Sequence, residues 1–274
     1  MTGEQWTMIK NFSYLCARMN AYLNIKGHLH DLSRPQVMGI INVTPDSFYP
    51  SSRVAGEDAL RRRVEQIRDE GATMVDVGAV STRPGSTPAT EEEEVERLAW
   101  SLPIVREVWQ EGTVSVDTFR PAVARRAVED WGADIINDVS GGCREMTEVV
   151  SSLHVPYVLT QPDLRRMGET LEEMRLAGVA DIILDPGIGF AGGTDEDFRL
   201  LSRLPALSDE LGCPVLVGVS RKSMIRNTLG VSTEEALTGT ICLNTIALMK
   251  GATILRVHDV REAAQCISLC SRLT

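Results

Sequence analysis

Val37-Met38-Gly39-Ile40-Ile41-Asn42-Val43-Thr44-Pro45-Asp46-Ser47-Phe48 is the stretch that sets the pattern of this chain, an apolar strand running into a polar loop. Pro45 fixes its own backbone φ angle and lacks an amide donor, so the loop is rigid at that point. Asn42, Thr44 and Asp46 offer hydrogen-bonding groups just beyond the buried strand. Folds that alternate strands with helices place their sites at the carboxyl ends of the strands. The stretch therefore predicts a strand of such a fold with a binding site at its end.

The same pattern recurs along the chain. Eight short apolar segments rich in Val and Ile are expected as strands, at 37–43, 73–78, 113–117, 134–138, 156–160, 181–185, 214–219 and 252–257. Helical segments alternate with them, at 57–70, 91–111, 121–131, 144–153, 167–178, 195–211, 233–250 and 259–273. Eight such units predict an α/β protein with a single (β/α)8 TIM barrel. An open doubly wound sheet is the alternative, but the even spacing and the missing GxGxxG motif argue against it.

The expected domain limits follow from this count. Residues 1–18 form an appendage, Met19 is a candidate start, and 19–274 form the barrel domain. Residues 22–32 alternate and turn at Gly27, which predicts a short N-terminal hairpin. The helix over 167–178 is expected to be the shortest between two strands, because it spans only about three turns.

Composition and charge argue against several classes of protein. The 274 residues carry a net charge of −10, which argues against an extended nucleic-acid interface. No apolar stretch approaches the roughly 20 residues of a membrane span, and no signal peptide is expected. The six Cys residues are scattered without a CxxC pair, so free thiols and a cytoplasmic location are expected.

Polar residues at the strand ends fall into two chemical sets. The first set suits a planar heterocycle with an amidine-like edge, because it combines carboxylates, an amide and an ammonium group: Asp117, Asn137, Asp185 and Lys222. The second set suits a phosphate or pyrophosphate group, because most of its members donate hydrogen bonds or carry positive charge: Asn42, Thr82, Arg83, Arg221, Arg256 and His258. Asn42 is also the candidate ligand for Mg²⁺, which takes few protein ligands beside substrate phosphates.

Several of these strand-end residues have a structural reading. For Asp76, a functional role and a structural role in accepting hydrogen bonds from backbone amides are about equally expected. Asp138 is expected to pair with a neighbouring loop, and Asp259 to cap the last helix. A single Arg or His would mean little, but seven strand ends with polar residues favour a site.

Seven motifs, taken together, resemble the dihydropteroate synthase family. They are NVTPDSF at 42–48, STRPG at 81–85, VDT at 116–118, IND at 136–138, DPGIGF at 185–190, SRKS at 220–223 and RVHDV at 256–260. The resemblance covers the chain from about residue 20 onward and implies a TIM barrel. It further implies the condensation of 6-hydroxymethyl-7,8-dihydropterin diphosphate with 4-aminobenzoate, with release of pyrophosphate, in folate biosynthesis. Sulfonamides compete at this step, and the family's usual course is SN1-like.

The resemblance also assigns roles to residues. Those expected to bind pterin are Asp117, Asn137, Asp185 and Lys222, and those expected at the pyrophosphate and Mg²⁺ site are Asn42, Arg256 and His258. The aminobenzoate and loop region is expected to contain Thr82, Arg83, Pro84, Arg221 and Ser223. Asp117, Lys222 and Arg83 are expected to take part in catalysis. The family further implies a homodimer formed through the last helices.

The chain departs from the family pattern in places. Thr160-Gln161 stands where family members usually have Met-His, and Ala191-Gly192-Gly193 replaces a Gly-Lys-Thr-like stretch. These departures keep open a pterin-binding paralogue without turnover. A pterin-binding methyltransferase-type barrel is a further alternative, but such proteins lack the SRK and RVH segments.

Overall fold

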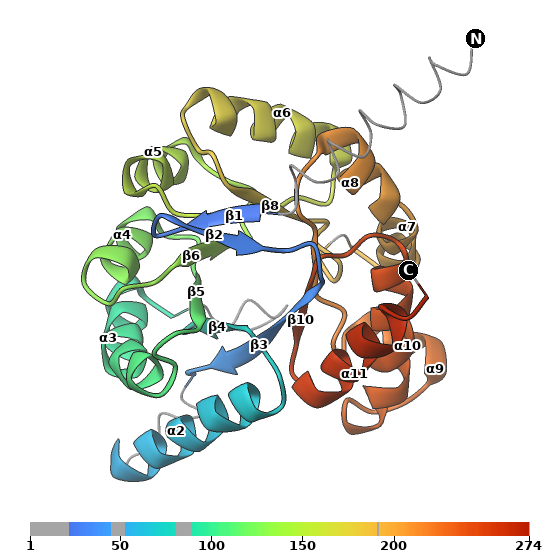
Figure 1. Cartoon of the computed structure of the whole chain (residues 1–274), viewed down its shortest axis with the longest axis horizontal. Coiled ribbons are helices and arrows are strands. Elements are labelled where there is room, and N and C mark those ends of the chain that lie inside the picture. The colour runs from blue at the N-terminus through green and yellow to red at the C-terminus, as the bar shows by residue number, and fades with distance from the viewer. Residues whose placement is uncertain (1–21, 45–52, 81–88, 191, 274) are drawn as a thin grey trace.

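The protein is a closed barrel of parallel strands surrounded by helices (Figure 1). The computed structural model describes residues 22–44, 53–80, 89–190 and 192–273. The barrel strands are β3 (Gln36–Asn42), β4 (Met74–Gly78), β5 (Thr113–Asp117), β6 (Ile135–Asp138), β7 (Tyr157–Thr160), β8 (Ile182–Asp185), β9 (Leu216–Val217) and β10 (Ile254–Val257). They pair in the order β8-β7-β6-β5-β4-β3-β10-β9, and a parallel bridge from Leu184 to Val215 joins the two ends. The predicted single TIM barrel is therefore confirmed, and the open-sheet alternative is wrong.

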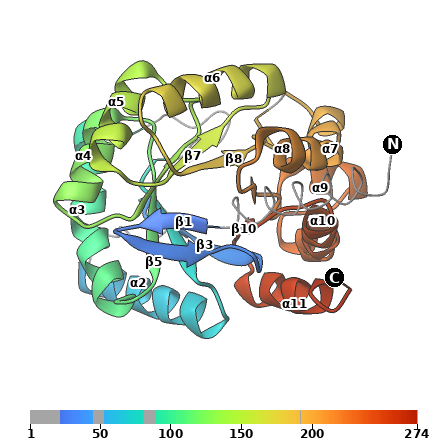
Figure 2. The ribbon, with the colours of Figure 1, turned by 45° about the horizontal axis from the view of Figure 1, so that its top comes forward.

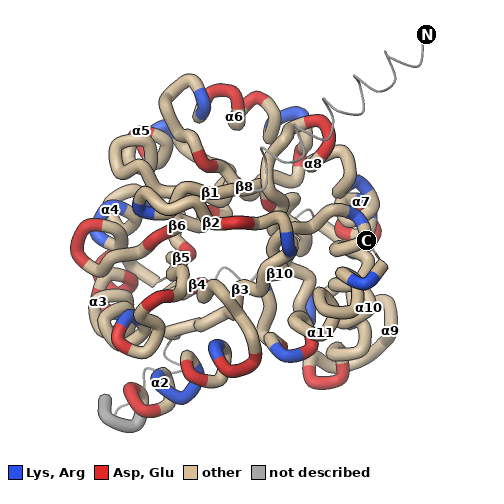
Figure 3. Tube along the Cα trace, viewed as in Figure 1, with Lys and Arg blue, Asp and Glu red and all other residues tan. Residues whose placement is uncertain are grey.

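Helices form the outer ring of the barrel, as two views show (Figures 1 and 2). They are α2 (Arg53–Asp69), α3 (Glu91–Val108), α4 (Pro121–Glu129), α5 (Arg144–Leu153), α6 (Leu164–Leu176), α7 (Thr194–Ser202), α8 (Leu204–Leu211), α9 (Ser223–Leu229), α10 (Leu237–Met249) and α11 (Val260–Cys270), with a 3-10 turn at Glu234–Ala236. The helices carry residues of both charges, as α2 illustrates (Figure 3). In the described part of the chain, no helix is long and apolar enough to cross a membrane.

Two of the predicted helices differ from the observed ones. The segment 195–211 forms two helices, and the break falls just before Pro205, which lacks an amide donor and is favoured in the first turn of α8. The helix predicted over 167–178 is α6, with 13 residues, and it exceeds α4 with 9 and α5 with 10. The expectation of an unusually short helix between the fifth and sixth strands is therefore wrong. Helix α9 was not predicted.

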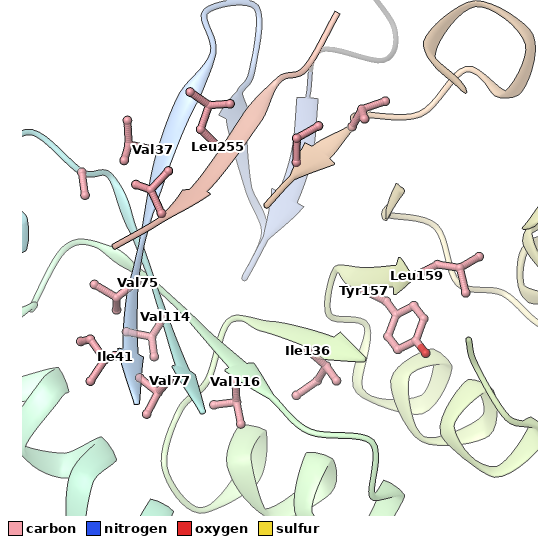
Figure 4. Packing of buried hydrophobic residues seen from close by; sticks show 14 of the residues in the cluster. Val37, Ile41, Val75, Val77, Val114, Val116, Ile136, Tyr157, Leu159 and Leu255 are labelled. Atoms are coloured by element: carbon pink, nitrogen blue, oxygen red, sulfur yellow. The ribbon is translucent and has the colours of Figure 1, made fainter. Parts of the chain in front are cut away.

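Alternation along the strands divides the core into two layers. Side chains at every second position face the helices and form the larger cluster, which includes Val75, Val77, Val114 and Val116 (Figure 4). The intervening positions face the barrel interior. At the amino-terminal end of the barrel, these interior positions are apolar and fully buried: Met38, Met74, Ile135, Val158, Ile183, Leu216 and Ile254. We call these seven residues the apolar plug.

The predicted hairpin is confirmed and closes the barrel below the apolar plug. Strands β1 (Tyr22–Ile25) and β2 (His28–Asp31) pair antiparallel around Lys26 and Gly27, whose φ angles are 51° and 83°. Two positive φ angles in succession are typical of the tight turn that matches strand twist. Leu23 is 1% exposed and packs against the plug. The amide of Asn24 donates to Asp181 Oδ1 at 2.9 Å, which fastens the hairpin to the base of β8.

Candidate active site

A ring of polar side chains lies inside the barrel, directly above the apolar plug. Successive residues of a strand point to opposite faces, so the residue two positions after each plug residue also points inward. In five strands that residue is polar: Asp76, Asn137, Thr160, Asp185 and Arg256. Ser115 of β5, which pairs in register with Asp76, joins them. We call these six residues the polar layer.

Arg256 holds the polar layer together. Its Nε donates to Asp76 Oδ2 at 2.7 Å, and its Nη2 donates to Asp117 Oδ2 at 2.8 Å. Asn137 Nδ2 donates to the same Asp76 oxygen at 3.0 Å. Burial acts to lower the pKa of Arg256, but Asp76 and Asp117 raise it above its ordinary value. The guanidinium group is therefore a fixed cation that joins strand β10 to strands β4 and β5.

Two carboxyl groups of the site have raised pKa values. Burial raises the pKa of Asp117 to about 7, against the opposing effect of Arg256 and with a further increase from Asp76. Burial also raises the pKa of Asp185, which Lys222 opposes. Asp185 Oδ1 accepts a hydrogen bond from the Gly187 amide at 2.8 Å. Buried acids with shifted pKa values beside fixed cations are typical of functional sites.

Lys222 lies against the loop that follows β8. Its Nζ donates to the Ile188 carbonyl oxygen and lies 5.2 Å from the centre of the Phe190 ring. Burial lowers the pKa of Lys222 to about 8, which Asp185 opposes. Gly189 packs so closely that a methyl group there would lie 2.9 Å from Lys222 Cδ. Asp197 fixes this loop, because its Oδ1 accepts from the Gly189 amide at 2.6 Å.

Four oxygen atoms of the polar layer have no hydrogen-bond partner within the described ranges. They are Asp76 Oδ1, Ser115 Oγ, Asn137 Oδ1 and Thr160 Oγ1. All four residues are at most 2% exposed. Buried polar groups in folded proteins are nearly always paired, so such a cluster requires an explanation. A ligand rich in N–H groups would satisfy these oxygens.

The residues predicted to bind phosphate or aminobenzoate do not all remain available to a ligand in this structure. Arg221 is engaged by protein atoms, because it makes two hydrogen bonds to Asp259, at 2.9 and 2.8 Å, and donates to the carbonyls of Thr233 and Glu234. Asp259 therefore pairs with Arg221 and makes no side-chain cap on α11, so the capping prediction is wrong. Ser223 is the first residue of α9.

His258 belongs to the set predicted to bind phosphate, like Arg221 and Arg256 described above. Its backbone is held from two sides: its amide donates to Ser220 Oγ at 3.2 Å, and its carbonyl accepts from Arg63 Nη2 at 2.8 Å. Arg63 was not predicted. Thr82, Arg83 and Pro84 lie outside the described residues, so their predicted roles stay predictions.

Asn42 and Asp117 converge above the polar layer. A methyl group at Gly78 would lie 3.7 Å from Asn42 Oδ1 and 3.7 Å from Asp117 Oδ2. Within the described ranges, no three His, Cys, Asp or Glu side chains form a metal-binding group. An amide oxygen beside one carboxylate fits Mg²⁺, which takes few protein oxygens and fills its shell with water and phosphate. A zinc-type ligand set is not what these residues offer.

Sequence reasoning missed two parts of the site. Asp76 was weighed evenly between two roles, yet it is fully buried and accepts from both Arg256 and Asn137. Thr160 was noted only as a departure from a family pattern. Counting two residues onward from each plug residue would have identified both. Asp138 has structural partners, but they differ from the predicted neighbouring loop: Tyr157 Oη of strand β7 donates to Asp138 Oδ2 at 2.6 Å, and the Ser140 amide just after β6 donates to its Oδ1 at 2.7 Å.

Comparisons with known proteins agree with this geometry. The model of the pterin binding enzyme family matches residues 38–258. The dihydropteroate synthase of Clostridium beijerinckii is 37% identical over 84% of this chain and 90% of its own length. A folate synthesis bifunctional protein of Arabidopsis thaliana is 34% identical over 91% of this chain, which spans 59% of that longer protein. The structure of Xanthomonas albilineans dihydropteroate synthase with 4-aminobenzoic acid aligns with a TM-score of 0.83 at 33% identity, covering 93% of this chain and 98% of that one.

Proposed function

Since the chain belongs to the dihydropteroate synthase family, the transferases of folate synthesis, we propose that its polar layer binds the pterin ring of a dihydropterin diphosphate. The observation that carries this proposal is the set of four unpartnered buried oxygens beside Arg256. A pterin edge presents several N–H groups, and carboxylate and amide oxygens are their natural acceptors. Asp76, Asn137 and Asp185 supply such oxygens. Lys222 supplies a donor for the ring carbonyl or a ring nitrogen.

The proposed reaction joins the pterin methylene carbon to the amine of 4-aminobenzoate. In the SN1-like course, the bond from that carbon to the pyrophosphate oxygen breaks first and leaves a cationic pterin. The arylamine nitrogen then forms the new C–N bond and loses a proton. Asp117 lies beside the fixed cation Arg256, where its carboxylate would stabilise positive charge on the pterin.

The leaving pyrophosphate needs positive charge near the barrel mouth. We assign Arg256 to this anion, because it is a partly buried guanidinium near the carboxyl end of β10. We assign His258 to the same anion. We assign Thr82, Arg83 and Pro84, together with Arg221 just before α9 and Ser223 at its start, to the aminobenzoate. Mg²⁺ held by Asn42 and Asp117 would supply further charge neutralisation at the pyrophosphate.

The proposal also covers the oligomeric state and the cellular location of the protein. We expect a homodimer, supported by Ile246, Met249 and Leu269, which are exposed apolar residues of α10 and α11. A cytoplasmic location is supported by the five free thiols of the described residues.

The test is pyrophosphate release by the purified protein with dihydropterin diphosphate and Mg²⁺, with and without 4-aminobenzoate. Release that depends on aminobenzoate and yields dihydropteroate is expected. Binding of pterin by the folded protein without any release would instead identify a pterin-binding paralogue. Failure to bind pterin at all would refute the assignment of the polar layer.

A further inference from the structure

Thr160 is a buried polar residue at the end of β7. Its side chain faces inward, because Val158, two residues earlier, belongs to the apolar plug. The residue is 2% exposed, and its Oγ1 has no hydrogen-bond partner in the described part of the chain. Leaving a buried hydroxyl unpaired destabilises a protein, because the group loses its water without gaining a partner. Packing alone therefore gives no reason for a hydroxyl here, since Val has the same shape.

The neighbours of Thr160 show where its hydroxyl lies. In the sheet, β7 lies between β6, which carries Asn137, and β8, which carries Asp185. Thr160 is the register partner of Asp185. Its methyl group lies by Gly187, where an added methyl would be 3.3 Å from Thr160 Cγ2. The hydroxyl is thus part of the polar layer, next to a carboxylate whose own Oδ1 is held by the Gly187 amide.

We infer that the Thr160 hydroxyl is a ligand-binding group of this chain and donates or accepts a hydrogen bond to the pterin ring. This inference rests on the proposed function, because it names a further contact in the same site. A hydroxyl both donates and accepts, so it can serve a ring N–H or a ring nitrogen. The neighbouring acceptors, Asn137 Oδ1 and Asp76 Oδ1, are likewise unpartnered in the described residues, which points to one shared ligand.

The inference predicts opposite effects on stability and on binding. Thr160→Val keeps the shape and removes the hydroxyl, so the ligand-free protein should be as stable as the wild type or more stable. Pterin binding should weaken about two- to twelvefold, since a net hydrogen bond contributes about 0.5–1.5 kcal/mol. A residue with only a structural role would not produce this pair of changes.

The experiment uses the full chain with Thr160→Val and, as the matched control, Thr160→Ser, which keeps the hydroxyl. Titration calorimetry with dihydropterin diphosphate gives the affinity, and thermal unfolding without ligand gives the stability. We expect the Thr160→Val protein to bind pterin more weakly without a lower melting temperature. We expect the Thr160→Ser protein to bind pterin almost as tightly as the wild type. Equal affinity of Val and wild type would overturn the inference while leaving the proposed function intact. Weaker binding together with a lower melting temperature in Val would also overturn it, because packing would then be the cause. A wild-type protein that binds no pterin would overturn both proposals.

Discussion

Replacing Arg256 by Met would test whether the guanidinium group holds the polar layer together. The change removes the hydrogen bonds to Asp76 at 2.7 Å and to Asp117 at 2.8 Å. Both carboxylates stay in the interior, where an acid without its partner is strongly unfavourable. Breaking a buried ion pair from one side costs about 3–5 kcal/mol. The free energy of unfolding of a typical domain is about 5–15 kcal/mol, so this loss should remove a large part of the total stability.

The loss of stability should depend on pH. Burial already raises the pKa of Asp117 to about 7, with Arg256 as the main opposing effect. Without Arg256, that pKa should rise further above the value in the unfolded chain. An acid with a raised pKa in the folded state favours folding at low pH, and this contribution is lost as pH rises through the raised value. The deficit of Arg256→Met should therefore be smaller at pH 5 than at pH 8.

Urea unfolding of the wild type and Arg256→Met at pH 5 and pH 8 measures this effect. Adding Asp76→Asn to the variant removes one stranded charge and should restore part of the stability at pH 8. Arg61→Met is the matched control, because Arg61 pairs with Glu57 and Glu107 on the surface and should change stability little. Wild-type stability of Arg256→Met at pH 8, or an equal deficit at both pH values, would refute the reasoning.

Four further predictions concern the proposed reaction. Lys222→Ala should lower the rate of pyrophosphate release about a hundredfold or more, since a preorganised cation is lost, and wild-type turnover would contradict its assigned role. The wild-type kcat/KM should fall as pH rises through about 8, where Lys222 loses its proton, and Lys222→Arg should remove that decline from the pH–rate profile. Asp185→Asn should weaken pterin binding in calorimetry, because an acceptor becomes partly a donor, and an unchanged affinity would disprove edge recognition. Chelation with EDTA should abolish turnover and added Mg²⁺ should restore it, so activity in EDTA would argue against the Asn42 site.

Local pattern in the sequence was enough to predict the strands of the barrel. Each strand is a short apolar run between helical segments, and the hairpin has its own turn signal at Gly27. The strand-end rule also found Asp117, Asn137 and Asp185. The breaks in the helical segments were harder, because Pro205 was read as part of one helix and the short α9 was not recognised as a helix.

Long-range pairing could not be read from the chain. Arg256 and Asp76 are 180 residues apart, and their strands come together because β10 and β4 both pair with β3. Asp259 looked like a helix cap from its position, but a partner on a distant loop, Arg221, takes both of its oxygens. Choices between a local and a remote partner depend on the fold as a whole.

The hairpin at the base of the barrel has a kinetic consequence. With Leu23 and the apolar plug beneath it, the polar layer is the floor of the barrel interior, which is closed at its amino-terminal end. A molecule resting on that floor has to arrive and depart through the carboxyl-terminal mouth. When two substrates share the barrel interior, the one bound deeper must therefore enter before the other and cannot leave while the other is in place. With the pterin ring on Asp76 and Asn137, as we propose, this geometry predicts an ordered sequence of binding in which the pterin substrate comes first.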